Sequence, residues 1–133
     1  MIQRIQSLWL LLAAVVILLI LKLPYASVEA NSVFVPGNYI LFLLTVLLSI
    51  GALVAIFLFK RRAKQKRLIW LSILVCILFI VLMYFQALEF MGDIKGRFRE
   101  GALLPVAYII LMAMAYAGVH KDEKLVRSVN RLR

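Results

Sequence analysis

Four long runs of apolar residues, separated by short polar stretches, dominate the pattern of this chain. Crossing about 30 Å of hydrocarbon takes roughly 20 residues of helix, and a helix satisfies its own backbone hydrogen bonds in lipid. The pattern therefore predicts an all-α integral membrane protein, a four-helix bundle that forms a single membrane domain over residues 1–133. The expected spans cover residues 7–25, 39–59, 68–88 and 102–119.

Residues at the ends of these runs support the boundaries. Asn38 closes the turn-forming group 36–38 and is the predicted N-cap of the second span. Pro105 falls in the first turn of the fourth span, where its missing N–H costs little. Trp70 and Tyr84 lie near opposite ends of the third span, as aromatic side chains do at membrane interfaces.

The first run also has an interpretation as a cleaved signal peptide. Arg4 gives a basic start, and Val28 and Ala30 suit the small-residue positions before a cut. The apolar stretch is long for such a peptide, however, and the cut would lie far beyond it. We therefore prefer an uncleaved first span.

Composition agrees with a membrane protein. Of the 133 residues, 65% are hydrophobic, and the mean hydropathy is +1.03. A soluble domain of this length leaves too much of its surface in water to hide such a share. The formal net charge of +10 would indicate nucleic acid in a soluble protein, whereas basic cytoplasmic loops produce the same balance in a membrane protein.

The positions of the charges decide between these two interpretations. Because connections alternate sides, twelve of the sixteen lysine and arginine residues fall on one face of the membrane. The other four are Lys22, Lys95, Arg97 and Arg99. Short cytoplasmic loops carry such an excess, so both termini are expected in the cytoplasm, with the protein in an inner membrane.

Most of the cytoplasmic charge lies in a loop, residues 60–67, and a tail, residues 120–133. Each basic residue near a membrane surface contributes about 1 kcal/mol of attraction to anionic lipids. Nucleic-acid binding is not expected, since only Ala63 and Gln65 interrupt the charges of the loop. The predicted surface for anionic lipid or a protein partner consists of Lys60, Arg61, Arg62, Lys64, Lys66, Arg67, Lys121, Lys124, Arg127, Arg131 and Arg133.

The tail also has apolar residues at helical spacing, namely Leu125, Val129 and Leu132. This pattern predicts a short amphipathic helix at the cytoplasmic face. Anchoring on the lipid surface is the preferred interpretation, because the tail follows a span directly and lies beside the basic loop. Docking against another membrane or cytoplasmic protein is the alternative.

Small residues mark the expected helix contacts, because they let helix backbones approach closely in lipid. Gly51 and Ala55 form one pair on the second span, and Ala113 and Ala117 form another on the fourth. Packing within one bundle is preferred for both. Contact with another copy or another protein is the alternative, so a homo-oligomer stays open.

Chemistry inside the membrane is not expected. The middles of the four spans lack Asp, Glu, Lys, Arg and His, which transport and proton relay generally require. Thr45, Ser49, Ser72 and Gln86 are assigned structural roles, since hydroxyl groups bond back to their own helix and Gln86 lies near an end. Small multidrug exporters, which need an intramembrane carboxylate, do not fit this pattern.

The remaining reactive residues indicate no enzyme. Cys76 is the single cysteine, so no disulfide or zinc set forms within the chain, and a small buried hydrophobe is its expected role. His120 is the single histidine and is interpreted as a cation at the end of a helix. No catalytic residue, cofactor or metal site is predicted, and quinone-linked disulfide enzymes are disfavoured because they need cysteine pairs.

The two outer connections are assigned as loops. Residues 89–101 have mixed charges and zero net charge, which indicates a solvated loop, with a ligand or partner surface as the alternative. Residues 26–38 contain Val33, Phe34 and Val35, which lie on the membrane surface or fold over the bundle.

The two ends of the chain, MIQRIQSLWLLLAA and KDEKLVRSVNRLR, resemble the termini of a bacterial family of four-span membrane proteins. The family is catalogued as domain of unknown function 4293. The resemblance extends to the number of spans and the placement of loops. It implies an uncleaved first span and an inner-membrane location, and it implies no activity.

These observations favour a non-enzymatic accessory or scaffold protein that acts through its cytoplasmic basic loop and tail. The alternative is a small transporter or channel subunit that forms its pathway as an oligomer.

Overall fold

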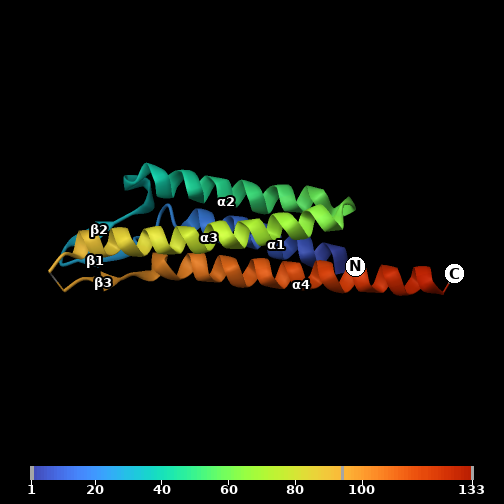
Figure 1. The fold of residues 1–133 in the computed structure, drawn as a ribbon. Coiled ribbons are helices and arrows are strands. Elements are labelled where there is room, and N and C mark those ends of the chain that lie inside the picture. Colours follow the sequence, from blue (N-terminus) through green and yellow to red (C-terminus); the bar gives the residue numbers. More distant parts are fainter. Residues whose placement is uncertain (1, 94, 133) are drawn as a thin grey trace.

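The computed structural model describes residues 2–93 and 95–132. Within them the chain is all-α apart from a small sheet, which confirms the all-α, four-helix part of the predicted fold class. Each helix runs antiparallel to its neighbours in an elongated up-and-down bundle (Figure 1). The helices are α1 (Ile2–Leu19), α2 (Tyr39–Phe57), α3 (Arg62–Met91) and α4 (Leu104–Arg131).

Three of these helices are long and apolar enough to cross a membrane, at Tyr39–Lys60, Arg62–Met91 and Glu100–Arg131. The first helix differs from the predicted span, 7–25, because α1 begins earlier and ends at Leu19. The amides of residues 21–23 donate hydrogen bonds to the carbonyls of Leu18 and Leu19, which closes the helix with a turn. Pro24 also disfavours a helical conformation in the residue before it. The apolar helical segment of α1, Ile5–Leu19, is shorter than the three long apolar helices.

The core lies along the axis of the bundle, where α1 and α3 each contact both α2 and α4. Small residues occupy many of the contact positions, which brings the helix backbones close together. Larger side chains fill the space between them. The buried residues include Leu10, Ala13, Ala14 and Ile17 of α1, Leu48, Ala52 and Ala55 of α2, Ile69, Cys76 and Phe79 of α3, and Tyr108, Met112, Ala115 and Val119 of α4.

The polar groups of the bundle are used locally. Asn38 caps α2 as predicted, since its Oδ1 accepts hydrogen bonds from the amides of Ile40 and Leu41 at 2.9 and 3.3 Å. Thr45 donates its hydroxyl hydrogen to the carbonyl of Leu41, as expected for a hydroxyl in a span. The Tyr108 hydroxyl donates to the carbonyl of Leu48 at 3.0 Å and so joins α4 to α2.

A three-stranded antiparallel sheet closes one end of the bundle, which we call the sheet end. It consists of β1 (Ala26–Val28), β2 (Asn31–Val33) and β3 (Arg97–Phe98), in the order β2-β1-β3. The two outer connections, predicted as separate loops, are therefore paired with each other. Val35 is fully buried, so the first outer connection, residues 26–38, folds over the bundle. Short 3-10 turns, η1 (Val35–Gly37) and η3 (Glu100–Leu103), lead into α2 and α4.

The opposite end, which we call the basic end, is more helical than predicted. The prediction of a loop over residues 60–67 is wrong for most of its length. The short turn η2 (Leu58–Lys60) follows α2, and α3 already begins at Arg62. The alanine, lysine, glutamine and arginine residues of this segment are good helix formers. The expected separate tail helix is also corrected. No glycine or proline follows Val119, so α4 continues without a break to Arg131.

Candidate functional site

The structure joins the two basic segments that the sequence analysis treated separately. We call the part of α4 from His120 to Arg131 the extension of α4. Lys66, in the first turns of α3, forms an ion pair with Glu123 in this extension. The same carboxylate accepts a hydrogen bond from Arg127 Nη2 at 2.9 Å, one helical turn further along α4. Glu123 therefore organises basic residues from both helices into one surface.

The two acidic residues of the α4 extension attach it to different helices. Asp122 Oδ2 accepts a hydrogen bond from Gln6 Nε2 of α1 at 2.6 Å, while Glu123 binds Lys66 of α3. The hydrogen bond from Lys66 lowers the pKa of Glu123; partial burial opposes this shift, and the charges of Lys66 and Arg127 add to it. Glu123 is therefore ionised at neutral pH, as the ion pairs require.

Aromatic side chains lie beside this charged surface. The rings of Trp70 and Tyr116 meet edge to face at 6.3 Å, and Tyr116 stacks on His120 at 6.4 Å. A cavity of about 510 Å³ next to them is lined by basic, aromatic and aliphatic side chains, which are Ala63, Lys66, Arg67, Trp70, Leu71, Leu74 and Tyr116. A basic rim over an apolar wall suits the anionic headgroup and upper chain of a lipid.

A second cavity of about 250 Å³ shares Lys66 with the first and also contacts His120, Glu123, Lys124 and Arg127. Four of the predicted basic residues line these two cavities, namely Lys66, Arg67, Lys124 and Arg127. Most of the predicted set is exposed. Arg62 and Lys66 are half-buried, and Arg133 lies outside the described residues. The exposed members are Lys60, Arg61, Lys64, Arg67, Lys121, Lys124, Arg127 and Arg131.

The extension of α4 carries an apolar stripe that no described residue covers. Leu125, Val129 and Leu132 are 48%, 60% and 89% exposed. With Gly118 and Asp122 they are spaced alternately four and three residues apart, so they share one face of the helix. Gly118 and Asp122 face Gln6 of α1, and the stripe continues that face past the end of α1.

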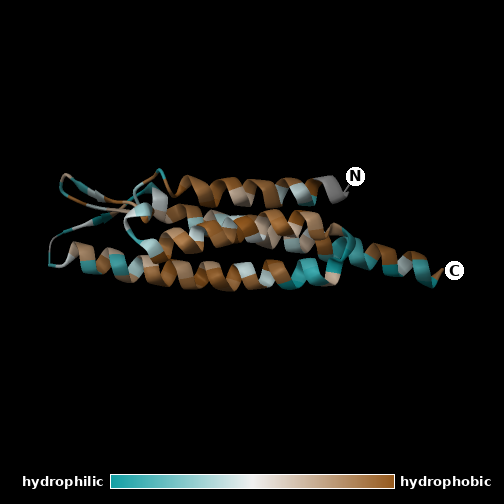
Figure 2. Cartoon of the chain, turned by 90° about the horizontal axis from the view of Figure 1, so that it is seen from above, coloured by the Kyte–Doolittle hydropathy of each residue, from teal (hydrophilic) through white to brown (hydrophobic). Residues whose placement is uncertain are grey.

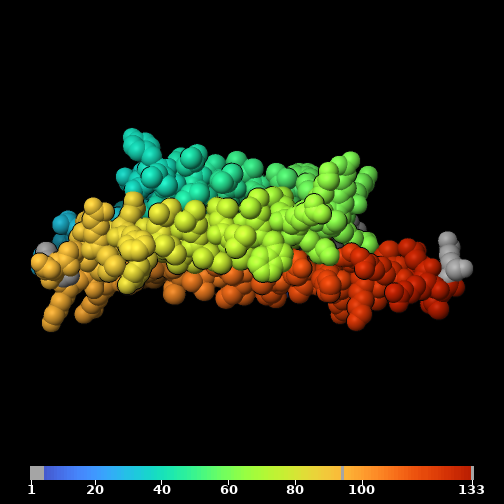
Figure 3. Space-filling view, viewed as in Figure 1, coloured from blue at the N-terminus to red at the C-terminus, as the bar shows by residue number. Residues whose placement is uncertain are grey.

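Beyond Glu123 the extension stands clear of the other helices. In Figures 1 and 3 it projects from the basic end beyond the α2–α3 connection, and in Figure 1 it also extends past the start of α1. Figure 2 shows hydrophilic and hydrophobic residues alternating along it, in contrast to the continuous apolar belt of the bundle. It therefore presents a charged and apolar surface that is free on most sides.

The two predicted pairs of small residues have different surroundings. Ala55 is buried between α2 and α3, and a methyl group at Gly51 would lie 3.0 Å from Ser72 Oγ. Ala113 and Ala117, by contrast, are exposed on the outer side of α4. The preferred packing of this second pair inside the bundle is therefore corrected. The face of α4 that packs inside consists of Met112, Ala115 and Val119 instead.

Sequence reasoning did not find the link between α3 and α4 or the stacking of His120. The four-residue spacing of Tyr116 and His120 is a signal for the second contact, because such residues lie one above the other on a helix. Within residues 2–93 and 95–132, no group of three histidine, cysteine, aspartate or glutamate residues is placed to hold a metal ion.

One comparison with known proteins gives a match. The family model described as "Domain of unknown function (DUF4293)" matches residues 2–132, nearly the whole chain. No curated protein and no solved structure matches significantly.

Proposed function

The chain belongs to the DUF4293 family, and we propose that it is a non-enzymatic accessory or scaffold protein of the bacterial inner membrane that acts through its basic end. The three long apolar helices fit a membrane protein. The 18 residues of α1 extend about 27 Å, close to the hydrocarbon thickness, so α1 serves as a fourth span. The excess of lysine and arginine at the basic end supports a cytoplasmic location for that end.

The observation that carries this proposal is the continuity of α4 through its extension. The twelve residues from His120 to Arg131 extend about 18 Å along the helix axis. A helix that continues straight from a span carries Leu125, Val129 and Leu132 away from the membrane instead of laying them on it. The stripe is thus better placed for a protein than for the lipid surface.

The charges beside the stripe define its partner. Lys124, Arg127 and Arg131 are exposed next to the apolar residues. A helix or groove with apolar residues at its centre and acidic residues at its edge is complementary to this surface. A second copy of the chain would instead oppose basic residues to basic residues, which is unfavourable.

Anionic lipid has a separate place in this proposal. The cavity beside Trp70, Lys66 and Arg67 lies between the apolar belt and the charged extension, at the level of a cytoplasmic headgroup. Lipid bound there would hold the start of α3 at the membrane surface while the extension reaches a partner.

Site-specific photocrosslinking in native membranes tests the partner. A benzophenone amino acid replaces Val129 in one variant and Asn130 in another, and adducts are identified by mass spectrometry. The two side chains point about 100° apart around the helix. We expect a reproducible protein adduct from position 129 and several-fold less from position 130. If both positions capture lipid, or the same mixture of proteins, the scaffold proposal fails.

A transporter or channel subunit that works as an oligomer is the second candidate. It is supported by the exposure of Ala113 and Ala117 on the outer side of α4, where a second copy could approach closely. Proteoliposomes that show specific solute flux, abolished by Ala113→Leu but not by Val126→Leu in the extension, would favour this candidate over the scaffold.

A further inference from the structure

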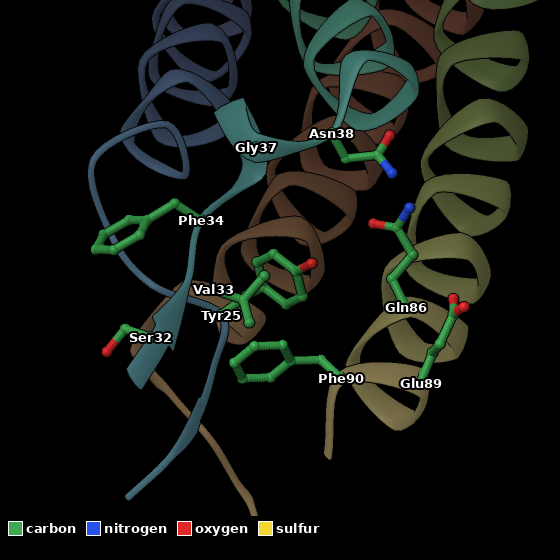
Figure 4. A pocket seen from close by; sticks show the side chains of 9 residues that line it. All are labelled: Tyr25, Ser32, Val33, Phe34, Gly37, Asn38, Gln86, Glu89 and Phe90. Carbon is green, nitrogen blue, oxygen red and sulfur yellow. The ribbon is translucent and has the colours of Figure 1, made fainter. Parts of the chain in front are cut away.

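A cavity of about 560 Å³ lies at the sheet end, far from the basic surface. Its walls come from the segment around the β1–β2 hairpin, the start of α2 and the last turns of α3 (Figure 4). Its polar lining residues include Tyr25, Asn38, Gln86 and Glu89, with Phe90 as an aromatic wall. The volume falls within the usual range for small-molecule sites.

Tyr25 is the first sign that the cavity is a binding site. Its side chain is 1% exposed, yet no described residue forms a hydrogen bond with its hydroxyl. Every fully enclosed side-chain oxygen or nitrogen among the described residues has a partner, so this hydroxyl must open into the cavity. Burial raises the pKa of Tyr25, which keeps the hydroxyl protonated and able to donate.

Asn38 provides a donor whose orientation is fixed. Its Oδ1 is occupied by the amides of Ile40 and Leu41, so its Nδ2 group points away from α2. In Figure 4 this NH₂ group faces the amide of Gln86 across the cavity. Tyr25, Asn38 and Gln86 therefore offer neutral donors from three different elements to one space.

Glu89 gives the cavity a negative charge. Glu89 and Phe90 follow Gln86 by three and four residues, so each is a neighbour of Gln86 on the surface of α3, and all three line the cavity. No ion pair involves Glu89 among the described residues, and no lysine or arginine lines the cavity. A ligand that carries a cation would therefore meet an unpaired carboxylate here.

We propose that this cavity binds a zwitterion made of a protonated primary amine and a phosphate, the chemistry of an aminoethyl phosphate headgroup. The ammonium group pairs with Glu89, and the phosphate oxygens accept hydrogen bonds from Tyr25, Asn38 and Gln86. Phe90 packs against the methylene groups between them. An anionic headgroup without an amine would meet the Glu89 carboxylate uncompensated, so this end has the opposite lipid preference to the basic end.

The position of the cavity favours the headgroup of a membrane lipid. It opens where α2 begins and α3 ends, next to the exposed side chains of Tyr39 and Ile40. This is the level at which the apolar belt of the bundle gives way to polar residues. Acyl chains attached to the headgroup would lie along that belt.

Titration of the purified full chain in lipid-free detergent micelles tests the proposal, with native mass spectrometry as the readout. The probes are dihexanoyl phosphatidylethanolamine, dihexanoyl phosphatidylglycerol and soluble aminoethyl phosphate. Lysine residues of the basic end bind the glycerol lipid in every variant, so the measured quantity is the change that each substitution causes. We expect Glu89→Gln to weaken binding of the ethanolamine lipid about tenfold without weakening that of the glycerol lipid.

Two further variants complete the test. Glu100→Gln, which removes an exposed acid at the same end outside the cavity, should leave all affinities unchanged. Tyr25→Phe should weaken binding of the ethanolamine lipid several-fold, with circular dichroism confirming that the chain stays folded. Soluble aminoethyl phosphate that competes at equal concentration assigns the site to a soluble zwitterion, and a need for acyl chains assigns it to lipid. Equal effects of Glu89→Gln and Glu100→Gln overturn the proposal.

Discussion

The two ends of the bundle are closed by different kinds of interaction. At the sheet end, backbone hydrogen bonds connect the two outer segments. The amide of Arg99 donates to the carbonyl of Tyr25, and the amide of Gly101 donates to the carbonyl of Pro24, both at 3.0 Å. At the basic end, side chains connect the helices, through a hydrogen bond from Gln6 to Asp122 and an ion pair between Lys66 and Glu123. The sheet end therefore has fixed geometry suited to a cavity, whereas the basic end responds to salt and pH.

The largest expected effect comes from adding one methyl group at the sheet end. A Cβ atom at Gly101 would lie 2.6 Å from the carbonyl oxygen of Pro24, which is backbone and cannot move aside cheaply. Gly101→Ala should push β3 away from β1 and lower the free energy of unfolding by about 3 kcal/mol. Thermal unfolding in detergent micelles measures the change.

Gly37 offers the matched control for that substitution. A Cβ atom there meets nothing within 4 Å, although Gly37 also belongs to the sheet end. Gly37→Ala should leave the unfolding temperature almost unchanged. Equal losses from the two substitutions would show that the close approach of Gly101 to Pro24 does not hold this end together.

The sheet end could not be predicted from the sequence. The hairpin turns at Glu29 and Ala30, and Glu29 adopts a φ of 51° without being glycine or asparagine, so the usual turn signal is missing. Each strand is only two or three residues long. The pairing of Ser27 with Arg97 joins segments about 70 residues apart, which no local pattern reveals. The cavity beside Tyr25 could not be predicted for the same reason, because its walls come from segments that are far apart in the sequence.

A smaller effect on the free energy of unfolding is expected from substitutions in the middle of α4, where one side of the helix is buried and the other exposed. Ala115 is fully buried and Ala113 is exposed, although they lie two residues apart. Ala115→Leu should overpack the core and lower the free energy of unfolding by about 2 kcal/mol. Ala113→Leu should leave it unchanged in monomers. A loss for Ala113→Leu that depends on protein concentration would instead reveal an interface between copies.

At the basic end we expect a still smaller effect from Gln6. Gln6→Leu removes the donor to Asp122 and leaves that half-buried carboxylate without its α1 partner, at a cost of about 1 kcal/mol. The double variant Gln6→Leu with Asp122→Leu should recover most of the loss, because both polar groups are then absent. Thermal unfolding of the two variants checks this; a double variant no more stable than the single one contradicts it.

More of the basic end was within reach of the sequence. The positions of its charges and the apolar stripe from Leu125 to Leu132 follow from local spacing. The ion pair between Lys66 and Glu123 did not, because it depends on how α3 and α4 are aligned along their length. The exposure of Ala113 also depends on the rotation of α4, which small-residue spacing alone does not fix.

The smallest expected effect is the pH dependence of the α4 extension. The folded-state pKa of Glu123 lies below its ordinary value of 4.5, so its ion pairs contribute stability above that pH and lose it as the pH falls through the folded pKa. Protection factors for hydrogen exchange, corrected for the pH dependence of the intrinsic rate, should therefore fall in residues 121–132 on acidification, while those in residues 97–101 of the sheet end stay constant. Glu123→Gln should show low protection in residues 121–132 at neutral pH and lose this pH dependence. A pH dependence that survives in Glu123→Gln would contradict the role of Glu123, and the attachment of the extension would then rest on the contact of Asp122 with Gln6 of α1 instead of on α3.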